Sequence, residues 1–299
     1  MPTQDLLPAD TAMGALTLKV GDLALMSTYY ATALGLEVLE DGADVVVLGR
    51  RGSAVVRLES ARHLHLPQRG AAGLFHTALL FADRADLAAV VASAAQHPLS
   101  SFAGSADHLV SEAFYFSDPE GNGIELYFDR PRDTWDWARD ERGNRTVVMD
   151  SLPLPPGEYI EKHLTEDAAA HPEAKGAEVG HVHLQVGDVE TARRFYVDVL
   201  GFERTAGWHD QALFVSAGGY HHHMAMNVWN SRGAGPRKDT LGLGEVLIRV
   251  PEADEVGALA DRLAHAGITS HHTGAELRFE DPWRNRLRVA AADAPGGIA

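Results

Sequence analysis

The chain of 299 residues contains no cysteine, which excludes disulfide bonds, thiolate metal ligands and cysteine nucleophiles. No stretch approaches the roughly 18 consecutive apolar residues that a membrane-spanning helix needs. The first residues, MPTQDLLPADTAMG, also lack the basic start and the apolar core of a secretory signal. We therefore expect a cytoplasmic protein that does not bind membranes.

Basic residues are scarce as well. The 26 lysines and arginines stand against 42 aspartates and glutamates, so that the formal net charge is -16. Such a charge repels nucleic acid and anionic membrane surfaces at long range, and we expect no nucleic-acid partner. The chain does have 16 histidines, which leaves a metal site built from imidazole and carboxylate groups open.

An internal repeat organises the chain. Residues 14–37, GALTLKVGDLALMSTYYATALGLE, align without a gap with residues 180–203, GHVHLQVGDVETARRFYVDVLGFE. The second copy has His181 where the first copy has Ala15. A residue that the fold requires tends to occur in every copy of a repeat, so His181 is a candidate for chemistry.

Each copy of the repeat opens a unit of one strand, one helix and three further strands. In the first unit we expect Asp22 to cap the helix and Gly35 to end it. A second unit follows each copy, and DPEGNGIELY in the first half corresponds to DPWRNRLRVA in the second half. The sequence thus predicts an α+β fold of four βαβββ modules in two tandem halves, at residues 14–59, 74–128, 180–229 and 242–291.

The strings VGDLALMSTYYATALGLE, VGDVETARRFYVDVLGFE and FSDPEGNGIELY resemble the vicinal oxygen chelate superfamily of glyoxalases, bleomycin-resistance proteins and extradiol dioxygenases. The resemblance covers essentially the whole chain. It implies two tandem domains whose curved mixed sheets surround a divalent metal, with ligands from the first and last strands of a module. The domains are expected at 10–131 (modules one and two) and 178–292 (modules three and four), with a linker at 132–177.

The ligand positions that this resemblance implies differ between the modules. On the first strands they are, in module order, Ala15, His76, His181 and Glu245; on the last strands they are Arg57, Glu125, the histidines at 221–223 and Arg288. Coordinating residues therefore gather in modules two and three, whereas Arg288 would repel a metal ion. In the familiar enzymes of the superfamily, all ligands come from modules three and four.

If modules two and three face each other, and modules one and four pair likewise, His76, Glu125 and His181 converge. Two histidines and one carboxylate are the ligand set of non-haem Fe(II) oxygenases, and Mn(II) accepts the same ligands. His183 shares the strand face of His181 and is its rival as a ligand.

The resemblance to extradiol dioxygenases also implies catalytic groups. The segment GGYHHHMAMNVW resembles their Gly-x-His-His-x-x-Ala motif, whose second histidine is the acid-base catalyst; this position falls on His222. The segment DHLVSEAFYFSDPEGNGIELY resembles the stretch before their carboxylate ligand, which implies His108 as a histidine of the substrate or oxygen pocket and Tyr115 as a hydroxyl donor. On a strand, His221 and His223 would point to the face opposite to His222.

These residues predict an Fe(II)-dependent, catechol 2,3-dioxygenase-like enzyme of aromatic catabolism, whose partners are a small aromatic diol and O2. A glyoxalase-like isomerase or lyase would use the same sheets with four protein ligands. A metal-free binding protein would need no ligand set. The resemblance further implies a homodimer or another homo-oligomer, while the ring substituents of the substrate stay open.

Overall fold

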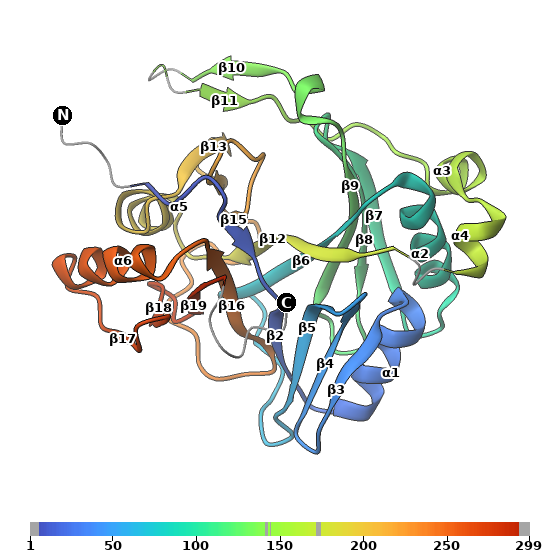
Figure 1. Cartoon of the computed structure of the whole chain (residues 1–299), viewed down its shortest axis with the longest axis horizontal. Helices are drawn as coiled ribbons and strands as arrows, with labels where there is room; N and C mark the ends of the chain where they lie inside the picture. Colours follow the sequence, from blue (N-terminus) through green and yellow to red (C-terminus); the bar gives the residue numbers. More distant parts are fainter. Residues whose placement is uncertain (1–5, 141–142, 144, 172–174, 293–299) are drawn as a thin grey trace.

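The structure, a computed structural model, describes residues 6–140, 143, 145–171 and 175–292. In this part of the chain, two large mixed sheets curve through the middle of the molecule, with α1 to α4 on one side and α5 and α6 on the other (Figure 1). One sheet has eight strands in the order β13-β14-β15-β12-β6-β9-β8-β7, and the other has nine, in the order β17-β18-β19-β16-β2-β5-β4-β3 with β1 beside β16.

The four predicted βαβββ modules are confirmed. Module one comprises β2 (Leu16–Val20), α1 (Leu23–Leu34), β3 (Glu37–Asp41), β4 (Val45–Arg50) and β5 (Ser53–Ser60). Module two comprises β6 (Gly73–Phe81), α2 (Arg84–Gln96), β7 (Ser101–Asp107), β8 (Ser111–Ser117) and β9 (Gly123–Asp129). The short strand β1 (Ala12–Met13) precedes both.

The second half of the chain repeats this order. Module three comprises β12 (Ala177–Gln185), α5 (Val189–Arg193) with its π-helical continuation η2 (Arg194–Val199), β13 (Glu203–Trp208), β14 (Ala212–Ser216) and β15 (Met224–Asn227). Module four comprises β16 (Gly242–Val250), α6 (Ala253–His265), β17 (Ser270–His272), β18 (Glu276–Glu280) and β19 (Arg286–Ala291).

The ends of α1 lie where the sequence predicts them. The Asp22 carboxylate accepts a hydrogen bond from the Leu25 amide at 3.0 Å, and Gly35 adopts the left-handed conformation (φ 63°) that ends a helix. In module three, Asp188 caps α5 in the same way, at 2.7 Å from the Thr191 amide. Local sequence signals therefore determine the same chain reversal in both copies.

The predicted pairing of modules is also confirmed. β6 of module two and β12 of module three run antiparallel at the centre of the eight-stranded sheet. β2 of module one and β16 of module four occupy the centre of the nine-stranded sheet. Each sheet thus takes one module from each half of the chain.

Equivalent buried hydrogen bonds tie the modules within each half together. The Tyr30 hydroxyl of α1 donates to Asp118 at 3.1 Å, and the Tyr196 hydroxyl of η2 donates to Asp281 at 2.9 Å. Both carboxylates lie in the turns before the last strand of modules two and four. The repeat is therefore preserved in polar core contacts as well as in secondary structure.

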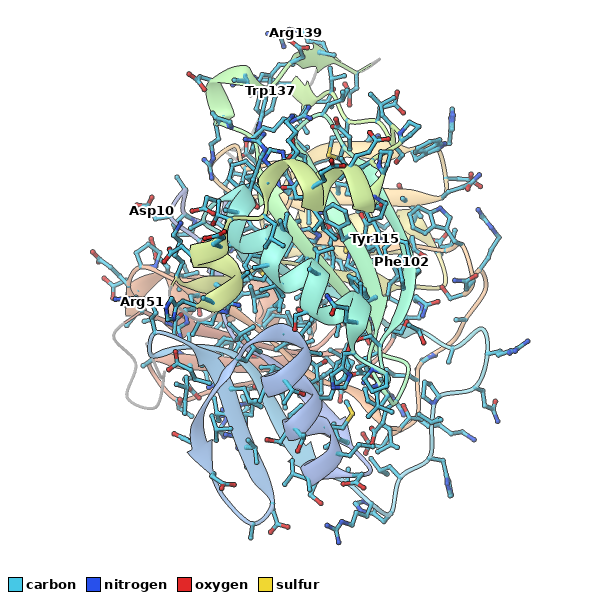
Figure 2. All side chains as sticks on the ribbon, turned by 90° about the vertical axis from the view of Figure 1, so that its right-hand side faces the viewer. Asp10, Arg51, Phe102, Tyr115, Trp137 and Arg139 are labelled. Carbon is cyan, nitrogen blue, oxygen red and sulfur yellow. The ribbon has the colours of Figure 1, made fainter. Side chains whose placement is uncertain are left out.

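The segment between the halves carries short elements of its own. After the turn η1 (Arg132–Thr134), the strands β10 (Trp137–Arg139) and β11 (Arg145–Val147) form a hairpin, and the helices α3 (Pro156–His163) and α4 (Glu166–Ala170) pack against α2. The hairpin, with Trp137 and Arg139, stands at one end of the molecule (Figures 1 and 2). None of the described helices combines the length and apolarity that crossing a membrane requires.

A buried ion pair holds the first half together, and its removal is expected to destabilise the protein. Arg50 is fully buried, bonds both oxygens of Asp86 at 3.0 and 3.1 Å, and donates to the carbonyl of Leu34 at the end of α1. The Arg50→Ala variant leaves the Asp86 carboxylate buried without its cation. We expect urea denaturation to show a loss of about 3–5 kcal/mol in the free energy of unfolding.

The matched control is Arg232→Ala, which breaks a pair with Asp210 whose side chains are 57% and 76% exposed. Such an exposed pair contributes at most about 1 kcal/mol. Equal losses in the two variants would show that the Arg50 ion pair has no special role in stability.

Candidate metal centre

Three neighbouring strands bring the predicted ligands together. His181 on β12 and Glu125 on β9 are both paired in register with Ala78 of β6. His76 lies two residues before Ala78 on the same strand, so its side chain emerges on the same face of the sheet. The convergence of these three side chains therefore follows from the pairing of modules two and three.

The ligand atoms lie close together in the interior. Glu125 Oε2 is 2.9 Å from His76 Nε2 and 3.1 Å from His181 Nε2, and the three ligand atoms all lie within 4.8 Å of one another. The exposed fractions of the three residues are 6%, 3% and 1% for His76, Glu125 and His181. His76 Nε2 is buried and makes no well-formed hydrogen bond with a described residue, despite the nearby carboxylate. Two imidazoles and one carboxylate are ligands that a divalent transition-metal ion accepts, and the buried His76 Nε2, without a hydrogen-bond partner among the described residues, is available to bind it.

The protonation states of these groups also suit a metal site. Burial opposes charge on Glu125, but the imidazoles of His181 and His76 outweigh it and hold the pKa of that carboxyl well below its usual value. Burial lowers the pKa of His181. The site therefore presents a carboxylate and neutral imidazole, the forms that bind metals.

The rival histidine is engaged elsewhere. The Asn227 side-chain amide lies 2.9 Å from His183 Nε2, and the ring of His183 packs edge-on against His76 with centroids 4.9 Å apart. His183 is not a member of the cluster of ligand atoms. The geometry thus favours His181 as the ligand, with His183 as a wall beside it.

The histidine run 221–223 lies in the loop before β15, so the prediction that it belongs to a strand is wrong. Strand alternation therefore does not apply, and His221 lies beside His222, with their Nδ1 atoms 2.7 Å apart. The His222 ring packs 4.1 Å from that of His181. Burial, together with the neighbouring histidines, lowers the pKa of His222 well below its usual value.

Asp129, which no motif in the sequence singles out, holds this histidine pair. Its Oδ1 lies 2.9 Å from His221 Nε2. The Asp129 carboxylate can only accept, so His221 donates to it from Nε2; in the arrangement where His221 Nδ1 accepts from His222 Nδ1, Nε2 of His222 is the proton acceptor. The two-residue spacing of Glu125, Tyr127 and Asp129 on β9 could have indicated it, because residues two apart on a strand share one face of the sheet.

His108 and Tyr115 form a second polar pair. His108 Nε2 is 2.7 Å from the Tyr115 hydroxyl, and His108 Nδ1 is 2.7 Å from the carbonyl of Asp150. The carbonyl can only accept, so His108 donates to it from Nδ1. Burial and the nearby Glu125 raise the pKa of the Tyr115 hydroxyl well above its usual value, which keeps the phenol protonated.

A cavity of about 730 Å³ joins these groups. His76, His108, Tyr115, Glu125 and His222 all line it, and residues 146–151, which begin in β11, cover one side. Apolar and aromatic side chains supply most of the remaining wall, among them Phe75, Phe116, Val147, Phe214 and Trp229. Its size and apolar walls suit a small aromatic molecule.

Comparisons with known proteins identify the family and agree with this fold. The sequence model of the Glyoxalase/Bleomycin resistance protein/Dioxygenase superfamily matches residues 12–126 and 178–289. The chain belongs to this superfamily. It is 37% identical, over 278 residues, to a catechol-2,3-dioxygenase of Bacillus subtilis (strain 168). The aligned region covers 91% of this chain and 94% of that protein.

Two solved structures have the same fold as this chain. A putative dioxygenase from Bacillus subtilis subsp. subtilis str. 168 superposes with a TM-score of 0.61 at 13% identity, over 96% of this chain and 87% of that one. Glyoxalase I from Zea mays superposes with a TM-score of 0.56 at 14% identity, over 94% and 92% of the two chains. The predicted family and fold class are therefore confirmed.

Proposed function

We propose that this superfamily member is an Fe(II)-dependent extradiol dioxygenase that cleaves catechol-type diols with O2. The observation that carries the proposal is the buried set of His76, Glu125 and His181 beside a mainly apolar cavity. Three ligands on one face of an iron ion leave positions for a bidentate diol and for dioxygen. The name of the Bacillus subtilis relative, a catechol-2,3-dioxygenase, supports the same chemistry.

The bound iron would supply the centre at which the diol and dioxygen meet and exchange electrons. His222, which lines the cavity, accepts a hydroxyl proton of the diol through Nε2 and returns it later as a general acid. Asp129 and His221 hold His222 in the required tautomer. Tyr115 and His108 offer a hydroxyl and an imidazole to the substrate oxygens from the other side.

The glyoxalase-like alternative needs four protein ligands. Among the described residues, the group whose ligand atoms lie within 4.8 Å of one another contains three. His222 is tied to His221 through Nδ1, which suits proton transfer better than a fourth bond to the metal.

The proposal is tested by metal analysis after anaerobic purification, combined with oxygen uptake on addition of catechol. We expect about one iron per chain and rapid uptake that a chelator abolishes, since the ligand set suits Fe(II). The repeat provides a pair of variants with the same chemical change: Glu125→Gln should lose the iron, and Glu245→Gln, at the position in the other sheet that corresponds to His76, should keep it. Iron-free protein with no oxygen uptake would refute the proposal.

A further inference from the structure

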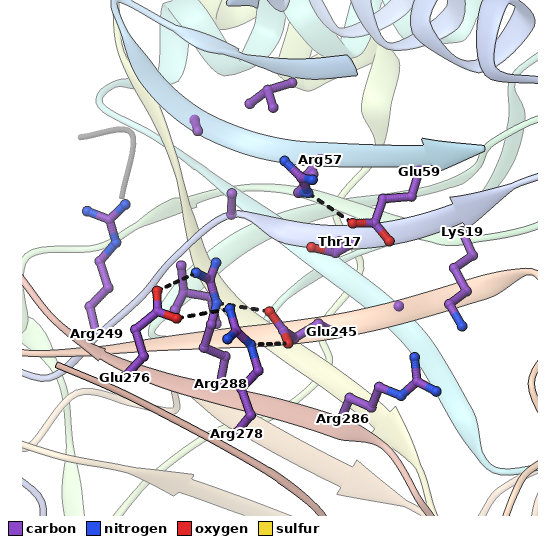
Figure 3. Close-up of a pocket in the computed structure, with 15 residues that line it drawn as sticks. Thr17, Lys19, Arg57, Glu59, Glu245, Arg249, Glu276, Arg278, Arg286 and Arg288 are labelled. Carbon is purple, nitrogen blue, oxygen red and sulfur yellow. Dashed lines mark hydrogen bonds and ion pairs between the residues drawn. The ribbon is translucent and has the colours of Figure 1, made fainter. Parts of the chain in front are cut away.

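The nine-stranded sheet contains a cavity of about 500 Å³ at the place that corresponds to the metal centre (Figure 3). The residues equivalent to His181, His76 and Glu125 are Ala15, Glu245 and Arg288, and all three line this cavity. Arg288 Nε lies 2.9 Å from a Glu245 oxygen. The Arg288 guanidinium therefore occupies the position at which the eight-stranded sheet would hold a metal ion. The nine-stranded sheet nevertheless keeps a cavity there.

The charges in this cavity are mainly positive. Three carboxylates line it, those of Glu59, Glu245 and Glu276. Six cations line it: Lys19, Arg57, Arg249, Arg278, Arg286 and Arg288. In Figure 3, Arg57 approaches from one wall, and Arg286 and Arg288 lie on the other.

An adjoining polar cavity of about 310 Å³ shares Lys19 and Arg286 and extends the basic lining. It adds the cations Arg237, Lys238 and Arg284 and the carboxylates Asp239 and Glu280. We refer to the two cavities together as the basic groove. Nine of the 26 lysines and arginines of the chain line this groove, with five carboxylates, although the net charge of the whole protein is -16.

The cations of the groove differ in how well they are neutralised. Glu245 and Glu276 form ion pairs with Arg288 and Arg278 at 2.9 to 3.4 Å. Arg237, by contrast, donates to neutral oxygens of Asn285 and Thr240 and makes no ion pair within 4.0 Å with a carboxylate of the described residues.

The shared pair Lys19 and Arg286 already converges on one oxygen. Lys19 Nζ and Arg286 Nη2 lie 3.1 and 3.2 Å from the same atom, Oδ1 of Asp239. The Asp239 side chain is 62% exposed, and the residue lies in a loop between β15 and β16. An exposed carboxylate on a loop is weakly held, so an anion from solution can replace it between the two cations.

We propose that the basic groove binds a small, multiply charged oxyanion, a phosphate or a dicarboxylate, centred between Lys19 and Arg286. Arginine forks bind such oxygens bidentately, and the local excess of positive charge attracts anions that the rest of the surface repels. The ligand takes the place of the Asp239 carboxylate. This site lies in the other sheet from the metal centre and does not depend on the proposed reaction.

The test is calorimetric titration of the metal-loaded protein with inorganic phosphate and, separately, with succinate, at constant ionic strength. We expect saturable binding of at least one of the two at one site per chain. The Arg286→Ala variant, whose side chain is 46% exposed and so tolerates replacement, should bind about tenfold more weakly because a charge-assisted bond is lost. Asp239→Asn should bind more tightly than the unmodified protein, because its competing carboxylate is gone.

Two controls complete the design. Arg194→Ala removes an exposed arginine paired with Glu190 outside the groove and should leave the Kd unchanged. Chelator-treated protein should also bind with an unchanged Kd, which distinguishes the groove from anion binding to the iron. The proposal is overturned by an absence of saturable binding of both anions, by an equal Kd in Arg286→Ala, or by loss of binding on chelation.

Discussion

The His181→Ala variant is expected to lose its metal and its oxygen-consuming activity while it remains folded. Changes in groups around a metal ligand alone cost about 10–100-fold in affinity, so the loss of the ligand itself should exceed about 100-fold. The effect is large because His181 Nε2 directly faces Glu125 at 3.1 Å. Metal content after anaerobic dialysis against a weak chelator measures it.

The matched control is His183→Ala. This residue lies on the same strand face, is equally buried, and bonds Asn227 instead of the ligand cluster. We expect it to keep the iron, with circular dichroism showing both variants folded. If His183→Ala lost the metal and His181→Ala kept it, the ligand assignment on β12 would be wrong.

The second large effect is expected for His222→Ala, which should retain iron and lose turnover. A positioned acid-base group contributes about 10²–10⁴ to the rate, and His222 is the histidine of the 221–223 run that lines the cavity. Steady-state oxygen uptake should therefore show a fall of that size in kcat. Asp129→Asn should give a smaller fall, since it acts on His222 only through His221.

The adjacent His223 provides the control for this variant. Its Nδ1 accepts a hydrogen bond from the Ala217 amide, away from the cavity, so His223→Ala should change kcat far less than His222→Ala. Loss of iron in His222→Ala would instead indicate a fourth protein ligand and would favour glyoxalase-like chemistry.

The parts of the fold that follow from local or repeated signals could be predicted from the sequence. The Asp22 cap and the Gly35 end of α1 are local, and the four modules are visible as a repeat. The pairing of modules two and three followed from chemistry, because His76, Glu125 and His181 can share one metal only if their strands adjoin. The register of β12 and β9 with Ala78 shows why this works.

Other features depend on tertiary contacts and could not be predicted. Two consecutive glycines, Gly218 and Gly219, have φ angles of 63° and 70° and turn the chain before the 221–223 histidines, which keeps that run out of the strand. The bond from His221 to Asp129 spans 92 residues. Lys19 and Asp239, which lie 220 residues apart, meet only when modules one and four pair.

The proposed extradiol activity is tested most directly by the identity of the product that the iron-loaded protein forms from catechol and O2. Mass spectrometry and proton NMR of the product determine it. Extradiol cleavage gives a ring opened beside the diol, with the mass of both oxygen atoms added and an aldehyde proton present. A dicarboxylic acid from cleavage between the two hydroxyl-bearing carbons, or unchanged catechol, would contradict it.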